Sequence, residues 1–234
     1  MNLSEQTVSI LKNFSTINQN LLVKQGKVLN TMSAMKNIVA KAEVEEEFPV
    51  EFAIYDLNEF LSCLSLFSTP ELTFKKGFVV MSEGKLKGTK LKYWFSDPSV
   101  VTSPTRELTM PLPVVSFLFE SSVLSEVTKA AAVIGAPDMV LEGFDASAVL
   151  KVTDKKNTTA NSYDSQIKLT GLLGTSTDPK EKIPFKFWFK VENLKLLSGD
   201  YDVDISEKRI SHFQHKKLPI EYFIALEPES SYGA

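Results

Sequence analysis

The side chains in this sequence best suited to metal binding or nucleophilic chemistry are those of two histidines and one cysteine. His212 and His215 form an H-x-x-H pair, a spacing found among zinc ligands. A zinc site needs three or four ligands, and the sequence has no third histidine and a single cysteine, Cys63. Lys216 and Lys217 follow the pair, so we interpret it as part of a polar loop. The sequence therefore predicts no metal site and no cofactor.

Motifs of nucleophilic and phosphate-transfer enzymes are also missing from the sequence. It has no G-x-S-x-G nucleophile elbow. Gly26-Lys27-Val28 and Gly84-Lys85-Leu86 lack the upstream glycine and the following serine or threonine of a P-loop. Cys63 lies beside an apolar helical stripe, a position more typical of a core residue than of a nucleophile. We therefore predict a protein that is not an enzyme.

The charged residues argue against sequence-specific DNA binding. The 234-residue chain has a net charge of −3, and only two of its 26 basic residues are arginines, Arg106 and Arg209. Proteins that read bases in a DNA groove are usually basic and rely on the rigid fork of arginine. Any contact with DNA should therefore be loose, sensitive to salt and made by scattered lysines.

The sequence shows no features of secreted or membrane proteins. Residues 1–6 have no basic or apolar run typical of a signal peptide, and no stretch of 18 apolar residues could span a membrane. One cysteine cannot form an intrachain disulfide, which fits a reducing compartment. We expect neither secretion nor membrane insertion.

Proline positions predict a division into two domains. Pro98, Pro104, Pro111 and Pro113 fall within a short stretch that is otherwise rich in serine and threonine. Proline fixes φ and lacks the amide donor, so neither a helix nor a central strand continues through such a stretch. We predict an N-terminal domain at 1–97, a connector at 98–113 and a C-terminal domain at 114–234.

Each half is predicted to contain two helices. Ser4–Ile17 and Ser122–Ile134 carry apolar residues at helical spacing, and Gly135 would end the second of them. Shorter helices are expected at Glu59–Phe67 and Leu194–Ser198, each after an aromatic strand and an asparagine. The repeated order indicates an internal duplication.

Short runs with period-two alternation between these helices predict an α+β fold of antiparallel sheets, with four short helices on one face. The expected strands are Leu72–Lys75, Gly77–Ser82, Leu91–Phe95, Val140–Phe144, Ala148–Thr153, Gln166–Leu172, Tyr201–Ser206 and Ile220–Glu227. The acidic run Glu45-Glu46-Glu47 is interpreted as a solvated turn.

Five segments, in order and spread over the whole chain, resemble the sliding clamps of T-even-type bacteriophages. They are Leu11–Asn18, Ala53–Asn58, Leu64–Leu66, Asp97–Val101 and Tyr222–Glu227. None is a catalytic signature, but their order, spacing and total length agree with the family.

The resemblance implies the DNA clamp fold shared with proliferating cell nuclear antigen. In that fold each subunit has two duplicated domains with two short helices each, and a homotrimer closes into a ring around duplex DNA. The implied partners are the DNA polymerase that the clamp tethers as a processivity factor, a clamp-loader ATPase and the late transcription machinery. The implied location is the host cell cytoplasm.

For contact with DNA, the resemblance indicates helix faces that line the hole. Lys12 lies opposite the apolar side of the first helix, and Lys129 opposite that of the third, among Ser125, Ala132 and Ala136. Lys195 flanks the last helix, whereas the outer face of the second helix has no basic residue. Each of these faces could instead be an ordinary solvated surface.

For partner binding, the resemblance indicates a pocket between the connector and the end of the last long strand. The candidate wall residues are Val101, Leu108, Leu112, Ala225, Leu226 and Pro228. Alternation accounts for some of them as plain core residues.

For assembly, the fold implies that edge strands of neighbouring subunits pair head to tail. The expected edges are Leu91–Phe95 and Gln166–Leu172, with Leu91, Trp94, Ile167 and Leu169 at the subunit interface. Unpaired edges of this kind must be covered, and a heterologous contact that closes makes a ring.

Two other functions remain open at this point. One is a two-domain viral structural or assembly protein without a DNA function, and the other is a β-rich hydrolase. A ring wide enough to encircle a duplex would favour the clamp, whereas a mapped active site would favour the hydrolase.

Overall fold

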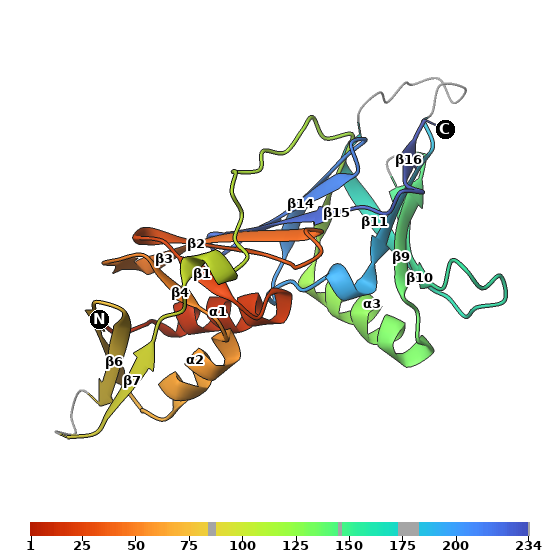
Figure 1. Ribbon diagram of the computed structural model, residues 1–234. Coiled ribbons are helices and arrows are strands. Elements are labelled where there is room, and N and C mark those ends of the chain that lie inside the picture. The colour runs from red at the N-terminus through yellow and green to blue at the C-terminus, as the bar shows by residue number, and fades with distance from the viewer. Residues whose placement is uncertain (84–87, 145–146, 173–182, 234) are drawn as a thin grey trace. The chain divides into compact units, whose positions relative to one another are not determined.

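A computed structural model describes residues 1–83, 88–144, 147–172 and 183–233 (Figure 1). The chain forms two compact units, Met1–Glu107 and Leu108–Ala234. The division falls inside the segment expected to be the connector, 98–113. The described residues include no helix that is long and apolar enough to cross a membrane.

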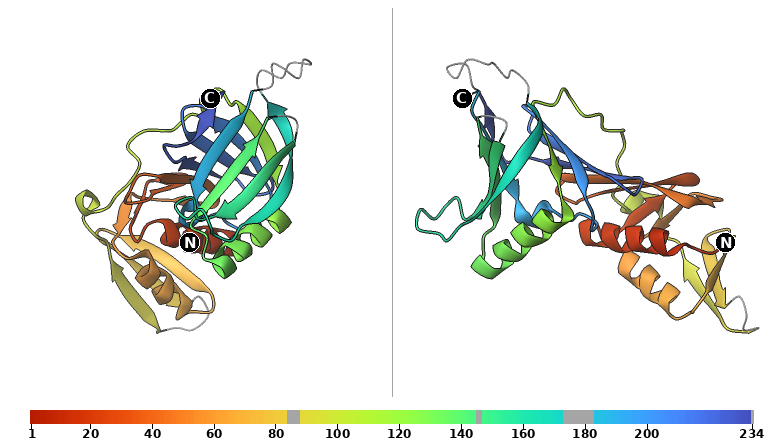
Figure 2. Two further views of the ribbon diagram at one scale, coloured as in Figure 1. Left: turned by 90° about the vertical axis from the view of Figure 1, so that its right-hand side faces the viewer. Right: turned by 180° about the vertical axis from the view of Figure 1, so that it is seen from behind.

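The two helices of the first unit begin at side-chain caps. Helix α1, Glu5–Ile17, is capped by Ser4, whose hydroxyl accepts a hydrogen bond from the Thr7 amide. Helix α2, Leu57–Ser65, is capped by the carboxylate of Asp56, so it begins two residues before the predicted start. Both helices bury an apolar stripe. They pack against each other, as the ribbon in Figure 2 shows. These two helix predictions are confirmed.

The strands of the first unit form small antiparallel sheets. Strand β1 (Leu21–Val23) pairs with β4 (Phe52–Ile54), and β2 (Gly26–Met32) pairs with β3 (Ile38–Phe48). A three-stranded sheet follows in the order β5 (Pro70–Lys75), β6 (Phe78–Glu83) and β7 (Lys90–Trp94). A 3-10 helix, η1, covers Pro98–Val100.

The acidic run interpreted as a turn lies inside strand β3, so that interpretation was wrong. Glu46 is held there because its carboxylate accepts hydrogen bonds from the Ser4 amide and the Thr7 hydroxyl at the start of α1. Burial pushes the pKa of Glu46 upward, but these hydrogen bonds outweigh it and hold the pKa below its ordinary value. Glu46 therefore joins the strand to the cap of α1.

The second unit is one continuous series of antiparallel strands with a helix packed on β10 and β11. The strand order is β16-β12-β9-β10-β11-β8-β13-β14-β15. The bounds are β8 Val115–Phe119, α3 Ser121–Ile134, β9 Asp138–Gly143, β10 Ser147–Thr153, β11 Tyr163–Leu172, β12 Phe185–Lys190, β13 Tyr201–Ser206, β14 Ile210–His215, β15 Ile220–Ala225 and β16 Ser231–Tyr232. Aromatic side chains fill its core, including Phe119, Phe187, Phe189, Tyr201, Phe213 and Tyr222.

The helix predicted at Leu194–Ser198 does not form. A 3-10 helix, η3, covers Val191–Asn193 instead, so the described residues contain three α-helices rather than four. The backbone of Leu197 explains the difference. Its amide donates to the Tyr222 hydroxyl at 3.1 Å, and its carbonyl accepts from the Tyr201 hydroxyl, so neither group is free for a helical turn.

Each unit repeats one order of elements. In the first unit α1 is followed by β1 to β4, then α2, then β5 to β7. In the second unit α3 is followed by β9 to β12, then η3, then β13 to β15. Ser96 bridges to Ala53 in β4, much as β16 pairs with β12. The two units are therefore duplicates with little sequence identity.

Candidate functional site

The histidine pair belongs to the sheet, not to a polar loop as expected. His212 lies on β14, where Nε2 is 2.8 Å from the Glu221 carboxylate and the ring stacks on Phe223. His215 is buried, and its Nδ1 accepts hydrogen bonds from two backbone amides of the following turn. Both rings thus support the strand and turn. The described residues contain no group of three or more potential metal ligands.

Lys12 and Lys129 are exposed on the polar faces of their helices. Lys12 lies on α1 opposite the buried Leu11 and Phe14, and Lys129 lies on α3 opposite the buried Val127. In the described part of the chain neither ammonium group has an ion-pair partner, so both charges remain available to a polyanion.

Two other expectations about the helix faces were wrong. Lys195 is half-buried in the loop after η3, because the fourth helix does not form. Ala136, expected on the outer face of α3, is buried. The helix ends at Gly135 in the left-handed conformation, and the Ala136 amide then turns back to the Ala131 carbonyl.

The six residues assigned to a partner pocket have different environments. Leu226 is only 7% exposed, and its amide donates to the Arg209 carbonyl, so its side chain belongs to the core. Ala225 and Pro228 on either side of it are exposed. Leu108 and Leu112 are 42% and 71% exposed. Val101 is half-buried in the first unit.

The two predicted edge strands differ. Strand β7 has one partner, β6, among the described strands, so it is an edge of its sheet. Strand β11 pairs with β10 over Tyr163–Lys168 and with β8 from Leu169 to Leu172, so among the described strands each part has a partner on one side only. Ile167 and Leu169 are buried within the subunit, so their side chains face its core.

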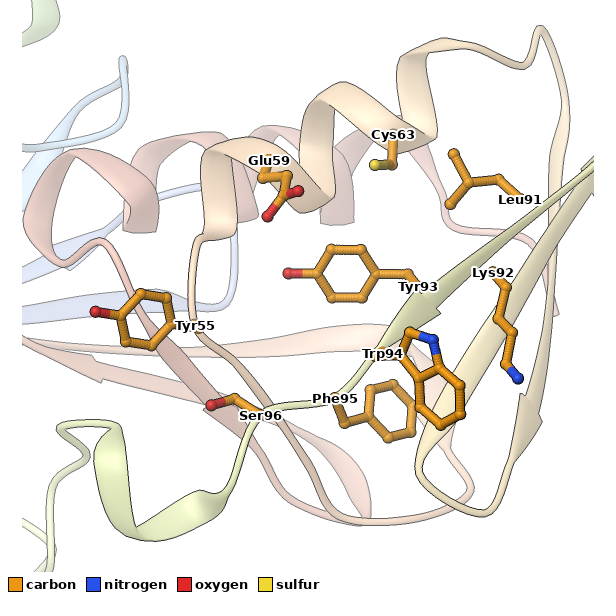
Figure 3. A pocket seen from close by; sticks show the side chains of 9 residues that line it. All are labelled: Tyr55, Glu59, Cys63, Leu91, Lys92, Tyr93, Trp94, Phe95 and Ser96. Atoms are coloured by element: carbon orange, nitrogen blue, oxygen red, sulfur yellow. The ribbon is translucent and has the colours of Figure 1, made fainter.

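A groove of about 570 Å³ lies between α2 and β7 (Figure 3). It was not among the sites expected from the sequence. Glu59 and Cys63 line it from the helix, and Leu91 and Tyr93 line it from the strand. The signal was present, because Leu91 and Tyr93 alternate onto the face of β7 that meets α2. Trp94 lies at the strand end and is 63% exposed.

Two titratable side chains in this groove have raised pKa values, which disfavours their reactive, deprotonated forms. Burial, aided by the charge of Glu59, raises the pKa of Tyr93 to about 12. Burial and the same carboxylate raise the pKa of the Cys63 thiol, which disfavours the nucleophilic thiolate. The groove therefore suits docking better than acid–base or covalent chemistry.

Comparison with known protein sequences gives consistent matches. The family model for the DNA polymerase processivity factor matches residues 4–82. The sliding clamp of Vibrio phage KVP40 is 33% identical over 232 residues, which cover 97% of this chain and 99% of that protein. The sliding clamps of Escherichia phage RB69 and Enterobacteria phage T4 are 27% and 26% identical, and each match covers 99% of both chains.

Solved structures are similar in fold. Proliferating cell nuclear antigen of Thermococcus kodakaraensis superposes with a TM-score of 0.68 at 13% identity, covering 97% of this chain and 99% of that one. The A. fulgidus antigen, solved with the C-terminal region of FEN-1 bound, gives a TM-score of 0.70 at 13% identity, covering 99% and 100%. At this identity the likeness shows the clamp fold alone.

Proposed function

The chain belongs to the phage sliding clamps that act as DNA polymerase processivity factors, and on this premise we propose that three copies close into a ring around duplex DNA. The observation that carries the proposal is the full-length match to the KVP40 clamp together with the clamp fold. A sliding clamp is not an enzyme, and family membership leaves neither the hydrolase nor the structural virion protein with support.

A closed ring explains how an acidic chain works on DNA. A ring threaded on a duplex is retained by topology, so tight contacts are unnecessary. Lys12 on α1 and Lys129 on α3 are the proposed DNA-facing charges, because both are exposed and unpaired in the described part of the chain. Lys195, half-buried in the loop after η3, is the third proposed DNA-facing charge and would contribute less than the two exposed lysines. Few contacts predict weak, salt-sensitive binding to linear DNA.

The proposed subunit seam pairs β7 of one copy with the open part of β11 of the next. Strand β7 offers unpaired backbone groups along its edge, and β11 offers them over Tyr163–Lys168. The groove beside Leu91 can receive apolar side chains of the neighbour, while Trp94 borders the seam. Ile167 and Leu169 would support the partner strand from its core side. Two different surfaces meet in such a contact, and its repetition closes a three-membered ring when each copy is rotated by about 120° relative to the last.

The proposed partner surface combines the connector with the end of the last long strand. Val101, Leu108, Leu112, Ala225 and Pro228 would contact a partner peptide, and Leu226 would hold the strand end in place. Docking of a terminal peptide is supported by the clamp relative solved with the C-terminal region of FEN-1. The proposed partners are the DNA polymerase, a clamp-loader ATPase and the late transcription machinery, in the host cell cytoplasm. In the proposed subunit, residues 1–97 and 114–234 form the two clamp domains, and residues 98–113 connect them.

Solution mass tests the proposed assembly. A subunit of 26.1 kDa predicts a trimer of about 78 kDa. Sedimentation equilibrium at micromolar concentration should give that mass. Sedimentation velocity should give a hydrodynamic radius larger than that of a compact sphere of equal mass. Monomers alone over this concentration range would contradict a self-assembled ring.

A further inference from the structure

The outer face of the β5–β6–β7 sheet gathers lysines around two aromatic rings. Lys75, Phe78 and Trp94 form one row across the three strands, because Lys75 pairs with Phe78 and Phe78 with Trp94. Lys90 and Lys92 follow on the same face of β7, since residues two apart point the same way. We call these five residues the basic–aromatic face.

Contacts within this face preorganise it. The Lys92 ammonium lies 3.8 Å from the centroids of both the Phe78 and the Trp94 rings, whose centroids are 5.1 Å apart. This double cation–π contact holds the lysine and the indole in fixed positions. Trp94 nevertheless remains 63% exposed. Lys75, Lys90 and Lys92 have no ion-pair partner among the described residues.

A ligand for this face must carry both negative charge and flat π surfaces. Protein interfaces are depleted of lysine, which makes a protein partner a poor match for three ammonium groups that have no ion-pair partner among the described residues. Proteins that bind single strands combine a basic track with aromatic rings on which unpaired bases stack. We propose that the basic–aromatic face binds single-stranded DNA, with a base stacked on Trp94 and phosphates beside Lys75, Lys90 and Lys92.

The proposed seam would leave this face accessible, with Trp94 at its border. Strand pairing at the edge of β7 uses in-plane backbone groups and leaves the faces of the sheet uncovered. The proposed site is therefore separate from the duplex-lining helices. It would hold the unpaired strand outside the hole, next to a primer–template junction.

Fluorescence of Trp94 gives a direct test. The chain has two tryptophans, so Trp188→Phe leaves Trp94 as the sole indole. Titration with a short oligothymidylate should quench its emission, and the quenching should weaken as salt rises. Three phosphate contacts predict a slope of about −2 in a plot of log K against log salt. No quenching at millimolar oligothymidylate and low salt would overturn the proposal.

Variants separate the proposed site from general charge effects. With a labelled oligothymidylate and anisotropy detection, Trp94→Ala should weaken binding at least about fivefold at concentrations where sedimentation shows the variant and the wild type in the same assembly state. Lys75→Ala should reduce the salt slope by about 0.7. Lys208→Ala, an exposed lysine on the other unit, is the matched control and should change neither. Lys75 lies on β5, two strands from the β7 edge proposed as the seam, so its effect should not arise from altered assembly.

Competition with duplex DNA and with polyglutamate tests whether the ligand is single-stranded DNA. A blunt duplex of equal length should bind this face more weakly, because its bases cannot stack on an indole. Equal binding of duplex and single strand at this face would overturn the proposal, and so would tighter binding of polyglutamate than of oligothymidylate, which would indicate an acidic protein partner.

Discussion

At the scale of single residues, several side chains have roles set by contacts far away in sequence. Glu46 caps the region of α1 from within β3, and His215 organises a turn through its Nδ1. Nothing in the local spacing of either residue indicates this. Polarity alone predicts a turn for the acidic run and a loop for the histidines, whereas the contacts place both in strands.

Replacing Glu46 with glutamine should reduce the pH dependence of folding stability. The pKa of Glu46 is lowered in the folded protein, so its contribution is complete above its ordinary value near 4.5 and is lost as pH falls through the lower folded value. Urea unfolding should therefore show Glu46→Gln less stable than wild type at pH 7, with the difference shrinking by pH 3. Glu45→Gln, on an exposed neighbour, is the control. A difference that grows on acidification would contradict the assignment.

Two leucines of the partner surface should respond differently to truncation. Leu226→Ala removes a buried side chain and should lower the free energy of unfolding by about 2–5 kcal/mol. Leu112→Ala removes an exposed one and should leave stability nearly unchanged while costing about 1–3 kcal/mol of affinity for the polymerase's terminal peptide. Thermal unfolding and peptide anisotropy measure the two effects. Wild-type peptide binding by Leu112→Ala would place the pocket elsewhere.

At the scale of elements, the spacing of apolar residues predicts those helices and strands that bury one continuous apolar face. The helices around Leu11 and Val127 were found because their apolar residues recur every three to four positions. Strands β2 and β3 are not among the expected strands, because two small alanines weaken the apolar alternation of β3 between Ile38 and Val44. The fourth helix does not form because tyrosine hydroxyls from β13 and β15 hydrogen-bond to the Leu197 backbone. Helical periodicity is enough to expect Lys12 and Lys129 on exposed helix faces, where the structure has them. The groove could not be predicted in this way, because it is formed by two elements, α2 and β7.

The edge of β7 should control assembly. Leu91→Asp places a charge in the groove beside this edge and should weaken trimer formation at least about tenfold, because the carboxylate would be desolvated at the seam. Thr73→Asp introduces the same charge on β5, on the exposed face of the same sheet, and should assemble normally. Sedimentation velocity across a concentration series compares them. Equal assembly of both variants would exclude β7 from the seam.

At the scale of the whole molecule, function depends on closure more than on contact strength. The net charge of −3 and the two arginines leave little capacity for tight DNA binding. Topological retention requires only that the ring remains closed. Family membership could be inferred from dispersed segments because the clamp fold constrains strand ends and connector positions throughout the chain, while the partner surface depends on local exposure that the sequence does not reveal.

Retention on circular DNA is the most direct measurement of the central claim. Labelled clamp, loaded on a nicked circle by its cognate clamp-loader ATPase and separated from free protein by gel filtration, should stay with the DNA at raised salt. One restriction cut should then release it within minutes, while blocking both new ends with bulky adducts should keep it bound. Equal loss from circular and cut DNA at raised salt, or retention on open linear DNA, would contradict encirclement.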